Sequence, residues 1–310
     1  MLKKLLLLAV AASPLLHASN SRTCSDSDLR PLNSLYEFTV FSKTHIHSQN
    51  SDILGNVGAG SNVDLRNFYI DGVLWSSSSI SLNQANVRTE IAAPRFNNLF
   101  RTGFRKVRRT DPFGGQQLLQ HKNTLDDLSH RLRSFETNLG ASVRGGVLDL
   151  AVIDTSSTVQ AITLNSSDFE KILAVNFTGP KHVVFVINVL GSEINVSHLG
   201  IHGIEDNRTG VRLLPNQIIW NFPNASSLTM ARSGTDLSHK INTRSHGVQN
   251  LGLPGFIIAP HASVQISDMA ITGGIHSKSV QHIYAERTPG AQVNGDYPPE
   301  WERIFNCQKK

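Results

Sequence analysis

The sequence is poor in charged residues and lacks the motifs that mark most enzymes. Charged residues make up 17% of the 310-residue chain and hydrophobic residues 39%. This composition excludes a disordered, highly charged protein and leaves enough apolar side chains for a large core. The net charge of +5 is too modest to predict a nucleic-acid partner. We therefore expect a globular chain with one large domain or two small ones.

Long hydrophobic runs are absent from the sequence after residue 16. Lys3 and Lys4 precede an apolar run from Leu5 to Leu16, and small residues follow it. The run is shorter than the roughly 20 residues that cross a hydrocarbon layer. We therefore expect residues 1–19 to be a secretory signal peptide, with no transmembrane segment and a secreted, extracellular mature protein, free or associated with the cell surface.

Cysteine is also scarce, since Cys24 and Cys307 are the only two. In a secreted protein this pair predicts a disulfide that closes almost the whole mature chain. Such a crosslink stabilises a fold by about 5 kcal/mol in the chain-entropy treatment. Two unpaired thiols near the chain ends are the alternative.

Catalytic and metal-binding patterns are missing. The sequence has no Gly-x-Ser-x-Gly elbow, no phosphate-binding glycine loop and no His-Glu-x-x-His motif. His45 and His47 would share one side of a strand, but no third ligand lies nearby in the sequence. Glu205 and Asp206 invite comparison with solenoid enzymes that cut polysaccharides, yet a polar turn explains them better. We predict no catalytic residue, metal or cofactor.

One dense group of basic residues stands out, in a stretch that also contains Phe100 and Phe104. A solvated loop explains such a group most simply, and binding of a polyanion such as an acidic glycan is the alternative. These residues are the candidates for a binding site: Arg101, Arg105, Lys106, Arg108 and Arg109.

Short β-branched runs between turn residues predict a mainly β fold. The exception lies between Leu118 and Leu139, where leucines recur at helical spacing. We expect a flanking α-helix at about 116–139 that ends at Gly140.

An internal repeat suggests the architecture. Residues of two segments match at a constant offset: Val57, Val63, Leu65, Ile70, Gly72, Leu74 and Ser76 against Ile258, Val264, Ile266, Ile271, Gly273, Ile275 and Ser277. In each copy, aliphatic residues two apart are followed by a corner, at Asn67 or Asp268, and then resume after a glycine. This pattern predicts coils of a right-handed parallel β-helix or solenoid. The first and last coils would stack, and the helix would cover the flank.

The segments Phe38 to Gly72 and Gln217 to Ser277, with the sequence WNFPNAS at 220–226, resemble the signature blocks of the choice-of-anchor A domain family. The resemblance implies an ice-binding-like adhesive β-solenoid domain at 36–285, an extracellular adhesive role and no enzymatic activity. Residues 20–35 would form an N-terminal segment and 286–310 a tail. The tail lacks the surface-anchoring signal that members of the family typically carry.

Three functions remain open. The first is a non-enzymatic, adhesin-like protein that binds an extracellular glycan, a matrix protein or another ordered surface through a solenoid face. A self-associating coat component and a polysaccharide-acting enzyme are the alternatives. The oligomeric state is left open. In a eukaryotic host, five sequons could carry glycans: Asn165, Asn176, Asn195, Asn207 and Asn224.

Overall fold

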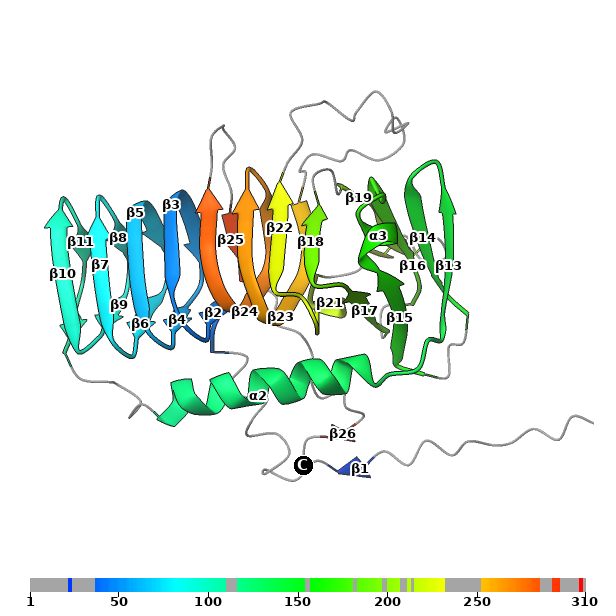
Figure 1. The fold of residues 1–310 in the computed structure, drawn as a ribbon, viewed down its shortest axis with the longest axis horizontal. Coiled ribbons are helices and arrows are strands. Elements are labelled where there is room, and N and C mark those ends of the chain that lie inside the picture. Colours follow the sequence, from blue (N-terminus) through cyan, green and yellow to red (C-terminus); the bar gives the residue numbers. More distant parts are fainter. Residues whose placement is uncertain are drawn as a thin grey trace, which may run out of the picture.

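The computed structural model is a β-solenoid with one long helix along its side (Figure 1). Nineteen of the described strands form one sheet that winds around a hydrophobic core, which confirms the predicted solenoid with a flanking helix. The structure describes residues 22–23, 37–109, 116–153, 157–180, 183–196, 200–206, 211–212, 215–231, 252–284, 292–295 and 307–308.

The first half of the solenoid repeats a coil of 17 residues. Ile46 pairs with Val63, and Val63 pairs with Ile80, so buried residues of successive coils stack in register. Its strands are β2 (Val40–Ser42), β3 (Ile46–Leu54), β4 (Val57–Ala59), β5 (Asn62–Ile70), β6 (Val73–Ser76), β7 (Ser79–Asn83), β8 (Asn86–Val87), β9 (Glu90–Ala92), β10 (Arg95–Phe100), β11 (Gly103–Phe104) and β12 (Val107–Arg108).

Each of these coils turns at a residue with a left-handed backbone. Asn50, Asn67, Gln84 and Arg101 have φ values of 54°, 47°, 53° and 42°, and they recur every 17 residues. Asparagine tolerates this conformation better than most residues, which explains two of the four positions. Asp268 has a φ of 51° in the second half, so the predicted corners at Asn67 and Asp268 are confirmed.

The second half stacks on the first through strands that are distant in sequence. Val40 of β2 pairs with Val57 on one side and with Ile275 on the other, which confirms that the first and last coils stack. The strands of this half are β15 (Val159–Asn165), β17 (Val184–Leu190), β18 (Glu193–Val196), β21 (Ile218–Asn221), β22 (Ser227–Ala231), β23 (Gly252–Ser267), β24 (Ala270–Tyr284) and β25 (Gln292–Asn294). Because β25 pairs with β24 and β3, the sheet continues past residue 285.

The order of the coils in space therefore differs from their order in the chain. The chain builds outward from β2 to an end coil formed by β10, β11 and β12 (Figure 1). It then crosses to the opposite end along α2 (Gln116–Arg133), and later strands build back until β24 meets β3. The helix thus runs beside both halves of the solenoid.

One side of the solenoid packs against α2 through a second hydrophobic cluster, distinct from the interior. The helix contributes Leu118, Leu125, Leu128 and Leu132, which are all buried. Burial of each leucine contributes about 1.5–3 kcal/mol. Facing strands and the segment before β2 supply Phe38, Phe41, Trp75, Ala92, Val159, Ala161, Val184, Val186, Ile219, Phe256 and Ile258.

The helix ends six residues earlier than predicted, at Arg133, and Gly140 lies within a strand instead of capping the helix. Asn138 explains the difference, because its side chain joins the edge of the solenoid. Its Nδ2 donates to the carbonyl of Val159 at 3.1 Å, and its Oδ1 accepts from the backbone N–H of Ala161 at 2.7 Å. These hydrogen bonds favour an extended backbone at Asn138, so Leu139 begins a strand although its spacing fits a helix.

A smaller five-stranded sheet lies at the end of the solenoid opposite the end coil (Figure 1). It begins with an antiparallel hairpin and continues with parallel strands. Its strands are β13 (Leu139–Arg144), β14 (Val147–Val152), β16 (Ala174–Thr178), β19 (Gly200–Asp206) and β20 (Val211–Arg212). Two short helical segments, α3 (Ser166–Phe169) and η1 (Pro215–Gln217), precede β16 and β21.

The chain ends meet in a two-stranded parallel pair, in which β1 (Arg22–Thr23) lies beside β26 (Cys307–Gln308). Cys24 is outside the described residues, so the disulfide with Cys307 stays a prediction. In the part of the chain that the structure describes, no helix has the length and apolar character to cross a membrane.

Candidate binding surfaces

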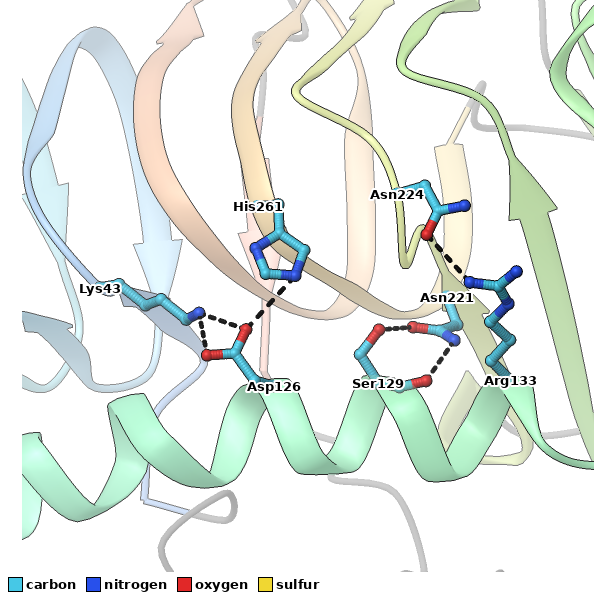
Figure 2. A network of polar contacts seen from close by, with 7 residues as sticks. All are labelled: Lys43, Asp126, Ser129, Arg133, Asn221, Asn224 and His261. Carbon is cyan, nitrogen blue, oxygen red and sulfur yellow. Dashed lines mark hydrogen bonds and ion pairs between the residues drawn. The ribbon is translucent and has the colours of Figure 1, made fainter.

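Polar contacts as well as apolar ones close the helix-covered side of the solenoid (Figure 2). The ammonium of Lys43 donates to both carboxylate oxygens of Asp126, at 2.5 and 2.6 Å. The Lys43 side chain is only 9% exposed, and Nε2 of His261 lies 3.6 Å from the same carboxylate. The ion pair therefore compensates a nearly buried charge and fixes the helix to the coil that begins at β2.

A buried amide network fixes the other end of the helix (Figure 2). Ser129 Oγ donates to Asn221 Oδ1 at 2.6 Å, and Asn221 Nδ2 donates to the Ser129 carbonyl at 2.9 Å and to Asn188 Oδ1 at 2.7 Å. Closer to the surface, Arg133 donates to Oδ1 of Asn224 at 3.1 Å. Asn221 and Asn224 of the WNFPNAS signature thus hold the helix, and this side is closed to a ligand.

Two histidines meet between these contacts. Nε2 of His121 lies 3.1 Å from Nδ1 of His276, whose Nε2 lies 2.9 Å from the carbonyl of Phe38. A carbonyl can only accept, so His276 carries its proton on Nε2 and accepts from His121 at Nδ1. Burial lowers the pKa of His276 to about 4, although the hydrogen bond to Phe38 acts in the opposite direction. The imidazole of His276 is therefore neutral near pH 7.

A second side, which we call the polar face, presents rows of polar side chains. Thr229 pairs with Asn195 and Gln265, and Asp64 pairs with His47 and Ser81, so their side chains form rows across neighbouring strands. Residues on either side of them along each strand are buried. The outward residues that define the face are His47, Asn62, Asp64, Ser79, Ser81, Arg95, Asn97, Glu193, Asn195, Ser227, Thr229, Ser263 and Gln265.

The polar face carries charges of both signs, and some of its side chains contact one another. His47 Nδ1 lies 3.3 Å from the carboxylate of Asp64, and His45 Nε2 lies 2.9 Å from Nε2 of Gln281. The two histidines therefore have separate polar partners. No group of three or more metal-ligating side chains occurs among the residues that the structure describes.

The third side contains a hollow at its boundary with the end coil. Tyr69 pairs with Asn86, and Asn86 pairs with Gly103, so this row of outward side chains ends at a glycine. A hollow of about 330 Å³ opens there. It is lined by Tyr69, Asn86, Val87, Arg88, Phe104 and Arg105.

The five basic candidates all lie on the end coil and are exposed, but they differ in their contacts. Arg108 pairs with Glu90 at 2.5 Å, and Arg101 forms the fourth left-handed corner of the 17-residue series. Arg105 lines the hollow, whereas Lys106 and Arg109 do not. Of the five candidates, Arg105 alone lines the hollow, and the structure places Tyr69, Asn86 and Arg88 beside it. A 17-residue spacing in the sequence could have aligned these coils. It is visible in the recurrence of Asn50, Asn67, Gln84 and Arg101.

The predicted sequons occupy different environments. Asn165 and Asn195 are exposed, and Asn195 belongs to the polar face. Asn176 donates to Asp149 at 3.0 Å, and Asn224 accepts from Arg133. Asn207 lies outside the described residues.

The fold is a β-solenoid with one side covered by a helix and two sides open to solvent. Family comparison agrees, because the model described as "Putative Ice-binding-like adhesive domain" matches residues 72–287. The match covers more than half of the chain, and the chain belongs to this family. The ice-binding-like adhesive domain implied by the sequence resemblance is confirmed.

A solved structure similar to this chain is the ice-binding protein of the Antarctic ascomycete Antarctomyces psychrotrophicus. The match has 12% identity and a TM-score of 0.37, and it covers 85% of this chain and 96% of the other. No curated protein matches the sequence significantly.

Proposed function

We propose that this chain is a secreted, non-enzymatic, adhesin-like protein whose polar face binds an extracellular glycan or a matrix or cell-surface component. The observation that carries the proposal is the registered row of polar side chains across parallel strands, from His47 through Asp64 to Ser81 and from Asn195 through Thr229 to Gln265.

A face of this kind suits a ligand that repeats. Neighbouring strands are spaced about 4.8 Å apart, so donors and acceptors recur at short, regular intervals. Each hydrogen bond contributes only about 0.5–1.5 kcal/mol net, and affinity requires several at once. The sheet holds these side chains in place before binding, which reduces the entropy lost on association. The mixed charges of Glu193, Asp64 and Arg95 predict binding that tolerates salt.

The composition of the face favours a glycan or a protein over ice. Among the described outward residues that define the polar face, Thr229 is the single threonine, and charged side chains interrupt the rows. A regular array of threonines is the sequence feature we would expect for ice. The same residues offer hydroxyl, amide and carboxylate groups, which complement sugar hydroxyls.

Self-association through strand edges is less well supported. β10 forms the edge of the described solenoid, because β7 is its one partner there. The end coil carries Arg101, Arg105, Lys106, Arg108 and Arg109, and charge on an edge opposes the addition of another strand. An end that polymerises would be expected to be apolar or of mixed charge.

The decisive experiment is binding of the mature protein to arrays of glycans and matrix proteins at two salt concentrations. The test variant is the double substitution Ser81→Tyr, Thr229→Tyr, which raises bulky rings above the polar face. Ser142→Tyr, on the exposed strand β13 outside the solenoid, is the matched control. The proposal requires saturable, salt-tolerant binding that the double variant loses and the control keeps. Equal binding by both variants, or no binding with concentration-dependent assembly, would overturn it.

A further inference from the structure

The hollow beside Gly103 is a site of a different character from the polar face. Outward side chains run along the third side from Asp52 through Tyr69 to Asn86, and the next position is Gly103. A Cβ at Gly103 would lie 3.1 Å from Oδ1 of Asn86, so a side chain there would crowd Asn86, which lines the hollow. With glycine at this position, the amide of Asn86 in the wall of the hollow is not crowded from the end coil.

Aromatic rings form part of its wall. Phe104 is 39% exposed, and its ring packs edge-on against Phe96 with the centroids 5.5 Å apart and the planes at 88°. This contact holds the exposed ring in place. Tyr69 adds a second ring to the wall, and Asn86 offers an amide donor and acceptor. Rings beside amides suit the apolar face and the hydroxyls of a sugar.

Two guanidinium groups line the same hollow. Arg88 donates to both carboxylate oxygens of Asp71, at 2.8 and 3.0 Å, so its position is fixed and its charge is largely compensated. The side-chain hydrogen bond to Asp71, its negative charge and Tyr69 raise the pKa of Arg88 above its ordinary value. Arg105 is exposed and has no ion-pair partner among the described residues. One cation is therefore left for an external anion.

We propose that this hollow binds an anionic sugar residue, with the ring against Phe104 and Tyr69 and its carboxylate or sulfate on Arg105. A volume of about 330 Å³ lies at the small end of ligand sites, which suits a single ring. The inference rests on the proposed extracellular binding role, but it uses a different surface from the polar face, so the two proposals can fail separately.

The test is calorimetric titration of the full mature chain with three oligosaccharides of equal ring number. Hyaluronan fragments carry carboxylates, heparin fragments also carry sulfates, and cello-oligosaccharides are neutral. The structure requires binding of at least one acidic oligosaccharide and at least tenfold weaker binding of the neutral one. Affinity for hyaluronan identifies carboxylate as sufficient, whereas affinity for heparin alone identifies sulfate. Equal binding of all three, or no binding of either acidic probe, overturns the proposal.

Three variants separate a built site from a diffuse cationic patch. Arg105→Gln removes the unpaired cation in the hollow and should weaken binding about 10- to 100-fold, as expected for a charge-assisted hydrogen bond. Arg109→Gln removes the same charge from the same coil outside the hollow and should change affinity less than twofold. Gly103→Leu should weaken binding at least tenfold with the charge unchanged.

Equal losses in Arg105→Gln and Arg109→Gln, with affinity that disappears at moderate salt, would show a non-specific patch and overturn the proposal. The double variant Ser81→Tyr, Thr229→Tyr should leave this binding intact, which distinguishes the hollow from the polar face. Circular dichroism of each variant establishes that the solenoid is folded.

Discussion

The imidazoles of His121 and His276 join the helix to the solenoid, with Nε2 of one 3.1 Å from Nδ1 of the other. Both side chains are fully buried. Phe41 packs against both rings, with centroid distances of 4.0 Å to His121 and 5.9 Å to His276. Because no solvent reaches His276 to stabilise a positive charge, its protonation opposes the packing of α2.

The pair predicts that stability decreases in acid. The pKa of His276 is about 4 in the folded protein and about 6.5 when unfolded, so the unfolded chain binds the extra proton between these values. The free energy of unfolding should therefore fall by about 3 kcal/mol from pH 6.5 to pH 4. Urea unfolding at a series of pH values measures this slope.

A non-titrating variant provides the control. His276→Gln keeps one donor and one acceptor, and its unfolding free energy should fall less over the same range. The comparison is needed because burial raises the pKa of Glu37 and Asp52. A carboxyl group with a raised pKa in the folded state increases the free energy of unfolding as the pH falls, which opposes the effect of His276. Identical slopes in the two proteins would assign the acid sensitivity to groups other than His276.

The nearly buried ammonium of Lys43 gives a second prediction. Asp126→Asn removes its counter-charge and should destabilise the protein by about 1–2 kcal/mol, less than for a fully buried pair because Asp126 is 45% exposed. Asp127→Asn, on the next helical position but exposed, should change stability by less than about 0.5 kcal/mol. Chemical denaturation compares the two, and an equal effect would mean that Lys43 is adequately solvated without its partner.

The amide of Asn221 gives a third prediction. Asn221→Ala leaves Ser129 Oγ and Asn188 Oδ1 without their buried partner and should destabilise the protein by about 2–4 kcal/mol. The matched control is Asn224→Ala, which removes an exposed contact with Arg133 and should change stability by less than about 1 kcal/mol. Thermal unfolding of both variants tests the ranking, and a larger loss in Asn224→Ala would contradict it.

Local sequence patterns predict the coils but not the order in which they stack. Val63 and Leu65, followed by a corner at Asn67, predict an inward strand and a turn, because alternation and turn chemistry are properties of neighbouring residues. The contact of Val40 with Ile275 joins residues at opposite ends of the chain. Many pairings of aliphatic strands are equally compatible with the sequence, and only packing in three dimensions selects this one.

The same limit applies to the candidate sites. The basic cluster was visible as a run of arginine and lysine, but Arg88 and Tyr69 join Arg105 only after three coils are aligned. The helix was predicted from leucine spacing, and its end was wrong because the competing contacts of Asn138 come from Val159 and Ala161, more than 20 residues away. Tertiary contacts override local propensity at both places.

The left-handed corners give a fourth prediction. Gln84 has a φ of 53°, a conformation that costs about 1–2 kcal/mol for most residues and more for a β-branched one. Gln84→Val should therefore destabilise the protein by about 1–2 kcal/mol, whereas Gln84→Asn should be neutral or slightly stabilising. Gln49→Val makes the same change at a strand position and should be tolerated. Similar losses at both positions would show that side-chain contacts, not the backbone, determine the effect.

The pairing of the two chain ends gives the last prediction. Arg22 lies in register with Cys307, and Thr23 with Gln308, so the backbone that leads into Cys24 runs beside the strand that contains the other cysteine. We expect the secreted protein to carry the Cys24–Cys307 disulfide. Intact mass should then rise by two hydrogen atoms on reduction, and no thiol should be alkylated beforehand. Because the crosslink closes almost the whole chain, reduction should lower stability by up to about 5 kcal/mol. Alkylation of both cysteines without reductant would show that the ends meet through β1 and β26 alone.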